Sequence, residues 1–164
     1  MEWRNEQGQL HRVDGPAVTY ADGTEVWYLN GQRHRADGPA FIGIDGQQEW
    51  WCRGKMHRAD GPAVIWADGS RWWYLNGQVH RVDGPAIEYA NGSQKWYLNN
   101  KLHRTDGPAF IEATGTKIWS LNDQLHRVDG PAIECVSGYK EWWANGRKLT
   151  DFEVWVLAGA KEHV

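Results

Sequence analysis

The sequence lacks the segments that mark membrane-spanning and exported proteins. No apolar run approaches the roughly 20 residues that a membrane helix needs. The first residues, Met1 to Glu6, contain no apolar core of the kind found in signal peptides. The formal net charge of −3 is small, so we expect no general attraction to nucleic acid or to an anionic membrane. These absences predict a cytoplasmic protein with no membrane partner.

Residues for covalent chemistry are also scarce. The chain has two cysteines, Cys52 and Cys135, which are too few for a disulfide framework. Its serines are few, and no Gly-x-Ser-x-Gly segment is present to form the exposed nucleophile turn of a hydrolase. We therefore predict no catalytic residues and a protein that is not an enzyme.

What the chain does have is a motif, His-Arg-x-Asp-Gly-Pro-Ala, in six copies. Each copy begins 23 residues after the previous one, and all six prolines of the chain lie in it. A fixed period of this length is the signature of a repeat array, in which one small unit stacks on copies of itself. The copies span His11–Ala17, His34–Ala40, His57–Ala63, His80–Ala86, His103–Ala109 and His126–Ala132.

Turn signals divide each repeat into extended segments. An apolar residue follows the motif, and a pair such as Asp22-Gly23 or Asn91-Gly92 comes soon after it. Such pairs between extended runs are the strongest short-range signal of a hairpin. A tryptophan then recurs in every copy, at Trp27, Trp50, Trp73, Trp96, Trp119 and Trp142. We predict an all-β fold: an antiparallel meander of six 23-residue hairpin repeats that forms one twisted or rolled sheet.

The turn signals also predict a register. A two-residue turn pairs residues symmetrically, which places Ile65 opposite Trp72. Because side chains alternate along a strand, the apolar residue after the motif then shares a face with the recurring tryptophan and the leucine that follows it. Val18, Trp27 and Leu29 form one such set, and we predict that this face is the core. The opposite face carries the positions that vary most, and we predict that it is the working surface.

The two ends depart from the repeat. Residues 1–10 resemble half a repeat and are predicted to cap the six-repeat array of residues 11–149. Thr150 and Glu153 have the spacing of a capping box. Helical spacing of apolar residues follows, so residues 150–164 are predicted to form a capping helix, from about Asp151 to Lys161. We expect one domain overall.

The combination of Trp-Tyr-x-Asn-Gly, a second strand and a 23-residue period resembles the MORN repeat and its bacterial variant. That variant occurs in antitoxin-like repeat proteins and in phage-encoded arrays that end in a helix after Asn-Gly-Lys-x-x-Thr. The segment Trp142–Thr150 is similar to that ending. The repeated His-Arg-x-Asp-Gly-Pro-Ala motif differs from the shorter glycine-containing turn of typical MORN repeats. The resemblance implies a non-catalytic binding or scaffolding role.

The repeated histidines and aspartates invite a metal interpretation, which distance argues against. Two strands per repeat, each about 4.8 Å apart, separate equivalent atoms by about 10 Å. Zinc ligands must lie about 2 Å from one ion, and a single copy supplies only one histidine and one aspartate. We therefore predict no metal and no cofactor.

Two interpretations of the motif remain. In the first, it is a structural corner: proline starts a strand, aspartate accepts backbone N–H groups, and arginine pairs with an aspartate. In the second, the arginines form an exposed ladder that binds phosphates or acidic surfaces. The candidate anion-binding residues are Arg35, Arg58, Arg81 and Arg104.

Two functions from different classes follow. The first is a protein-interaction module of the antitoxin, immunity or phage anti-defence type, which binds one protein partner. Tryptophan and tyrosine dominate interface energetics, so the candidate partner-binding residues are Trp51, Ile65, Trp72, Tyr74 and Tyr97. The alternative is an aromatic array that stacks a polysaccharide, a nucleotide or a single-stranded nucleic acid. A homodimer formed through one face of the sheet is a further option, since an open meander of about twelve strands is unusual.

Overall fold

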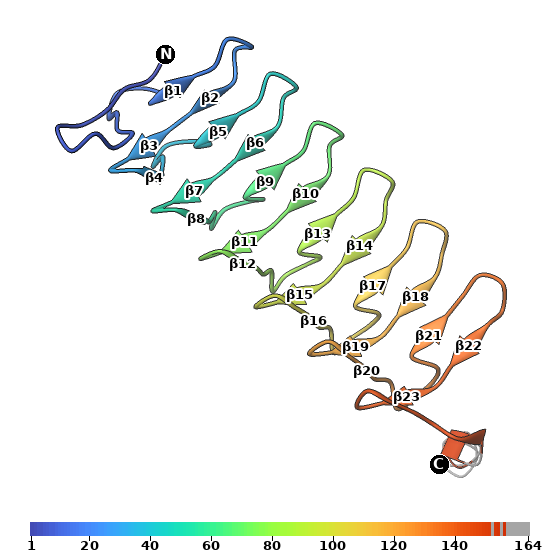
Figure 1. The fold of residues 1–164 in the computed structure, drawn as a ribbon. Coiled ribbons are helices and arrows are strands. Elements are labelled where there is room, and N and C mark those ends of the chain that lie inside the picture. Colours follow the sequence, from blue (N-terminus) through green and yellow to red (C-terminus); the bar gives the residue numbers. More distant parts are fainter. Residues whose placement is uncertain (152, 155, 157–164) are drawn as a thin grey trace. The chain divides into compact units, whose positions relative to one another are not determined.

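In the computed structural model the described residues are 1–151, 153, 154 and 156. The chain divides into two compact units, Met1–Arg81 and Val82–Val164. Both are built from antiparallel hairpins that follow one another in chain order, blue to green in the first unit and yellow-green to red in the second (Figure 1). The predicted all-β antiparallel meander is therefore confirmed.

Each repeat contributes two strands to a main sheet, and the strands of successive repeats pair in meander order. The first unit has the order β1 (Val18–Thr19), β2 (Glu25–Val26), β5 (Phe41–Ile42), β6 (Gln48–Glu49), β9 (Val64–Ile65) and β10 (Arg71–Trp72). The second unit has the order β13 (Ile87–Glu88), β14 (Gln94–Lys95), β17 (Phe110–Ile111), β18 (Lys117–Ile118), β21 (Ile133–Glu134) and β22 (Lys140–Glu141).

Each repeat also forms a second, shorter hairpin just before the next motif. In the first unit these hairpins are β3–β4 (Tyr28–Leu29, Gln32–Arg33), β7–β8 (Trp51–Cys52, Lys55–Met56) and β11–β12 (Tyr74–Leu75, Gln78–Val79). In the second unit they are β15–β16 (Tyr97–Leu98, Lys101–Leu102), β19–β20 (Ser120–Leu121, Gln124–Leu125) and β23–β24 (Trp143–Ala144, Arg147–Lys148).

The turn of the main hairpin differs from the one that the sequence predicts, and this changes the register. In the third repeat, Trp66 N–H bonds to the Ser70 carbonyl and Gly69 N–H bonds to the Trp66 carbonyl, which leaves a three-residue loop. Only its glycine has a positive φ (88°), so the loop is not a two-residue turn with two left-handed residues. Ile65 therefore pairs with Arg71, and Val64 pairs with Trp72. The predicted pairing of Ile65 with Trp72 is wrong by one residue.

A slip of one residue exchanges the faces. One side, which we call the variable face, carries Val18, Val26, Tyr28 and their equivalents in the other repeats. The other, which we call the motif face, carries Ala17, Trp27 and their equivalents. The prediction that the apolar residue after the motif shares a face with the tryptophan is therefore wrong.

The buried residues lie on both faces. The alanine that ends each motif is fully buried in all six repeats, and Val26 and Val64 on the variable face are 1% exposed. The predicted core on the Trp–Leu face alone is therefore also wrong. Because this alanine is fully buried in every repeat, a larger side chain there would have to displace its neighbours.

The N-terminal segment continues the array by pairing with β1. Trp3 N–H bonds to the Ala17 carbonyl, and Glu2 forms an isolated bridge with Val18. In the following repeats the recurring tryptophan makes the same bond, as Trp27 N–H does to the Ala40 carbonyl. Residues near the N-terminus thus occupy the place that the second strand of a preceding repeat would fill.

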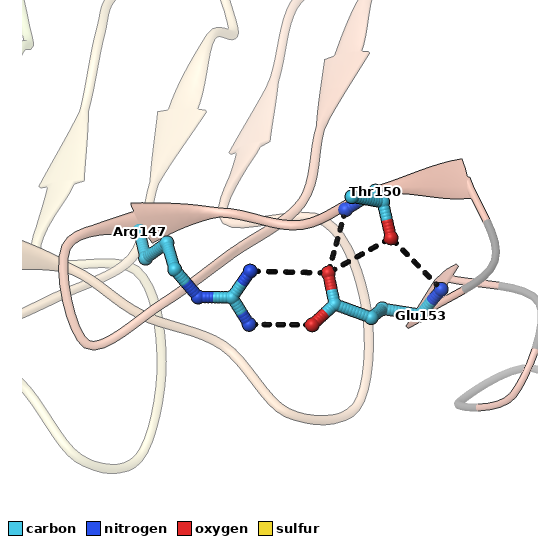
Figure 2. A network of polar contacts seen from close by, with 3 residues as sticks. All are labelled: Arg147, Thr150 and Glu153. Atoms are coloured by element: carbon cyan, nitrogen blue, oxygen red, sulfur yellow. Dashed lines mark hydrogen bonds and ion pairs between the residues drawn. The ribbon is translucent and has the colours of Figure 1, made fainter.

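The predicted capping box is present after the last repeat (Figure 2). Glu153 Oε2 accepts bonds from the Thr150 N–H and hydroxyl, and the Glu153 N–H bonds back to that hydroxyl at 3.4 Å. Arg147 forms an ion pair with the same carboxylate. The hydrogen bonds from Arg147 and from Thr150 lower the pKa of Glu153 to about 2. Most of the helix predicted over Asp151–Lys161 falls on residues 152, 155 and 157–161, which lie outside the described part.

Candidate functional site

The arginine of each motif is held from three sides on the motif face. Arg35 Nε donates to Asp37 at 2.9 Å, Arg35 Nη1 donates to the Pro39 carbonyl at 3.3 Å, and its guanidinium lies 4.2 Å from the centre of the Trp27 ring. The same stacking recurs as the pairs Arg12–Trp3, Arg58–Trp50, Arg81–Trp73, Arg104–Trp96 and Arg127–Trp119, at 3.9 to 4.5 Å. Each arginine therefore ties its own motif to the tryptophan of the preceding repeat.

The motif glycine is explained by close packing against that arginine. A Cβ atom placed on Gly38 would lie 3.0 Å from Cζ of Arg35, and the same contact recurs in the other repeats, as at Gly107 and Arg104. Gly38 does not have a positive φ, so conformational freedom is not the reason for glycine here. The guanidinium lies against the bare backbone of this residue.

The motif histidine ties the start of its repeat to the second hairpin of the same repeat. Nδ1 of His57 accepts the backbone N–H of Asn76, the first left-handed residue of the second hairpin turn, at 3.1 Å. The same bond joins His11 to Asn30, His34 to Arg53, His103 to Asn122 and His126 to Asn145.

The motif aspartates are exposed and anionic. Asp37 is 84% exposed, and the hydrogen bond from Arg35 lowers the pKa of its carboxyl group below the ordinary value. The pKa values of Asp14, Asp60 and Asp106 are lowered for the same reason. Three of the candidate anion-binding residues, Arg35, Arg58 and Arg104, thus already hold an anion of their own motif. Arg81 stacks on Trp73 in the same way.

Clefts lie between successive motif loops on this face. One in the first unit has a volume of about 720 Å³ and lies between the motif loops of Arg12 and Arg35, with Trp27 and Leu29 in its lining. Its counterpart in the second unit has about 460 Å³ and is lined by the residues 92 positions further on, such as Arg104, Trp119 and Leu121. These clefts arise from the repetition of the motif loops. Most of their lining residues belong to the motif or contact it.

The variable face of the first unit carries a chain of aromatic rings in the third repeat. The rings of Trp66 and Trp72 meet edge to face with their centroids 5.9 Å apart. Trp72 in turn lies parallel to Tyr74 at 6.4 Å. Two of the candidate partner-binding residues, Trp72 and Tyr74, are therefore in contact. Ile65 points to the motif face, because it pairs with Arg71, so the structure separates it from Trp72.

Trp51 lies on the same face and is fixed by charged neighbours. Its Nε1 donates to Glu49 at 2.7 Å, and the Arg33 guanidinium lies over its ring at 5.1 Å. Arg33 also pairs with Glu49, which is 8% exposed as a whole residue. The network orients the indole ring.

The second unit repeats the glutamate–tryptophan pair 92 residues later, with Lys148 as the cation that pairs with the glutamate. Glu141 accepts hydrogen bonds from Lys148, Tyr139 and Trp143, and these bonds lower its pKa to about 2. A glutamate two residues before the aromatic position thus accompanies tryptophan at both Trp51 and Trp143. That co-occurrence is visible in the sequence and would have identified the network.

Tyr97 lies in the second unit, on β15, and is the last candidate residue to place. Two residues before it, Lys95 extends over the rings of Tyr89 and Phe110, at 5.5 and 4.9 Å. Tyr97 is partly exposed on the variable face.

No protein-family model matches this sequence, and a comparison with curated proteins finds no match. In the part of the chain that the structure describes, no three histidine, cysteine, aspartate or glutamate side chains come close enough to hold a metal ion. No helix formed by the described residues is long and apolar enough to cross a membrane.

Proposed function

We propose that this protein is a non-catalytic binding module that grips one protein partner through the variable face of its repeats. The observation that carries the proposal is the chain of rings formed by Trp66, Trp72 and Tyr74. Trp66 is 37% exposed, and Trp72 and Tyr74 are partly exposed. The fold does not need a tryptophan at this strand position, because Val26 fills it in the first repeat and is buried there. Tryptophan and tyrosine are the residues that most often dominate binding energy between proteins.

The rings on both faces favour a protein partner over a stacking ligand. A stacking array needs open ring faces. The recurring tryptophans on the motif face carry the motif arginines, and Trp51 carries Arg33. Trp72 has Tyr74 against one face of its ring. A polysaccharide, a nucleotide or a single-stranded nucleic acid would have to displace these groups, whereas a protein contacts the edges and the exposed surface of the cluster.

The resemblance to MORN-like repeats supports the same proposal and suggests its biological form. We infer an antitoxin, immunity or phage anti-defence role, in which binding holds one partner protein inactive. Such a role requires a rigid surface and no catalytic group. The ion pairs and rings around Trp51 supply rigidity, since the indole is oriented before a partner arrives.

Comparative affinity capture tests the proposal. The tagged protein, Trp72→Val and Val13→Ser are each incubated with a lysate of the organism that encodes the chain, and the retained proteins are quantified by mass spectrometry. Val is the residue of the first repeat at the Trp72 position, so the fold should be kept. Val13 is 83% exposed on a motif loop and serves as the control. We expect one protein to be retained by the parent and by Val13→Ser and lost from Trp72→Val. Equal retention by all three, or retention of nucleic acid or glycan alone, would contradict the proposal.

A further inference from the structure

Lys95 occupies a distinctive place on the variable face of the second unit. On β14 it pairs with Ile87 on one side and with Phe110 on the other. Its Nζ atom lies 4.9 Å from the centre of the Phe110 ring and 5.5 Å from that of Tyr89. Two rings beneath an ammonium group attract it and restrict the rotamers of the long side chain. The Lys95 side chain therefore lies over the rings of Phe110 and Tyr89 and remains partly exposed.

The equivalent charges in other repeats are neutralised within the fold. Glu49 pairs with Arg33, and Glu141 pairs with Lys148. Within the described residues, Lys95 has no carboxylate at ion-pair distance. Glu112, two residues beyond Phe110, instead accepts a hydrogen bond from Thr114. The charge of Lys95 thus has aromatic neighbours and no anionic partner among the described residues.

The fold itself gives no reason for a lysine at this position. Ile118 stands at the same place one repeat later, where it also pairs with Phe110. Val26 stands there in the first repeat and pairs with Phe41. An apolar side chain thus satisfies the strand and its neighbours, so the fold does not require a cation at this position.

We propose that Lys95 binds a carboxylate of the protein partner, on an aspartate or glutamate flanked by an apolar residue. This assignment rests on the proposed function and names the chemistry of the partner. A cation already fixed over rings loses little rotamer freedom when it meets an anion. Tyr97, two residues along on the same face, and the Phe110 ring provide the apolar contact for the flanking side chain. A single lysine suits one carboxylate, whereas phosphoryl groups are usually bound by several arginines.

Nuclear magnetic resonance titration of the full chain tests the assignment directly. The probes are N-acetyl-glutamyl-phenylalanine amide, its glutaminyl counterpart and phenyl phosphate, and the readouts are the Lys95 ammonium and Tyr97 ring signals. We expect the glutamyl probe to bind about threefold to fivefold more tightly than the glutaminyl probe, as for a partly exposed ion pair. Lys95→Val should remove this preference. Lys101→Val, which removes an exposed lysine elsewhere in the same unit, should keep it.

Three outcomes would overturn the assignment. Equal affinity for the glutamyl and glutaminyl probes would show that the charge is not used. A preference that survives in Lys95→Val would place the anchor elsewhere. Tighter binding of phenyl phosphate than of the glutamyl probe would make the site one for phosphoryl groups. None of these results depends on Trp72, so the capture experiment with Trp72→Val can succeed or fail separately.

Discussion

At the scale of the residue, each position of the motif has one mechanical task. Arginine stacks on the tryptophan of the preceding repeat, aspartate fixes its Nε, and glycine provides the bare backbone against which the guanidinium lies. The structural interpretation of the motif anticipated the pairing of arginine with aspartate. The close approach at glycine was not predictable, because it depends on where a long side chain comes to lie.

Replacing Gly38 with alanine should loosen one of these corners. The new Cβ would lie 3.0 Å from Cζ of Arg35, so the guanidinium must move away from Trp27. We expect a loss of about 1–3 kcal/mol in the free energy of unfolding, as for other overpacked sites. Urea titration followed by tryptophan fluorescence measures it. Ala36→Val, which copies the residue at the same place in the first repeat, is the control and should be near neutral. A Gly38→Ala variant as stable as its control would refute the packing argument.

The motif ion pairs should also make the free energy of unfolding depend on pH in the acid range. The pKa values of Asp14, Asp37, Asp60 and Asp106 are lowered in the fold, so the unfolded chain binds protons at a higher pH than the folded chain does. Their contribution is therefore complete above about pH 4 to 5 and is lost as the pH falls through the lowered values. Urea midpoints measured between neutral and acid pH should fall more steeply for the parent than for Asp37→Asn. If the urea midpoints of the parent and of Asp37→Asn fall in parallel with pH, the Arg35–Asp37 pair does not make stability depend on pH.

At the scale of the element, two kinds of turn account for what the sequence could and could not predict. The second hairpin turns have two left-handed residues, as at Asn30 and Gly31, with φ of 50° and 76°, and this follows from Asn-Gly. The first turns also contain Asp-Gly, but the aspartate instead caps the loop, as Asp22 does by accepting the Thr24 N–H. An Asp-Gly pair alone does not distinguish a two-residue loop from a three-residue loop. The predicted register was therefore wrong by one residue, and the prediction assigned side chains to the wrong faces of the sheet.

The bond from His57 to the next hairpin gives an element-scale prediction. His57→Ala removes the acceptor of the Asn76 N–H, so the turn of the following hairpin loses its link to the motif. We expect a destabilisation of about 1 kcal/mol. Hydrogen exchange of the Asn76 amide should become faster, while that of the equivalent Asn30 amide, bonded to His11, should not change. Unchanged exchange at Asn76 would mean that the bond is not formed in solution.

At the scale of the whole molecule, the period of 23 residues predicted the architecture, because one motif recurs without a slip and alternating segments can only stack as hairpins. The candidate site was predicted less completely. Trp72 and Tyr74 do meet, whereas Ile65 points to the other face. Lys95 was not predicted, because the contacts with Phe110 and Tyr89 that distinguish its position form only in the folded chain. The residues that recur in every motif build the corners, and the proposed binding residues lie on the variable face.

The central claim is that the variable face, and the ring chain on it, binds a protein partner. Its most direct test is the dissociation constant of the captured partner for purified parent, Trp72→Val and Val13→Ser, measured by calorimetry. We expect Trp72→Val to bind at least about tenfold more weakly, as for a central aromatic anchor, and Val13→Ser to bind like the parent. Equal affinity of Trp72→Val and the parent, or a loss confined to Val13→Ser, would contradict it.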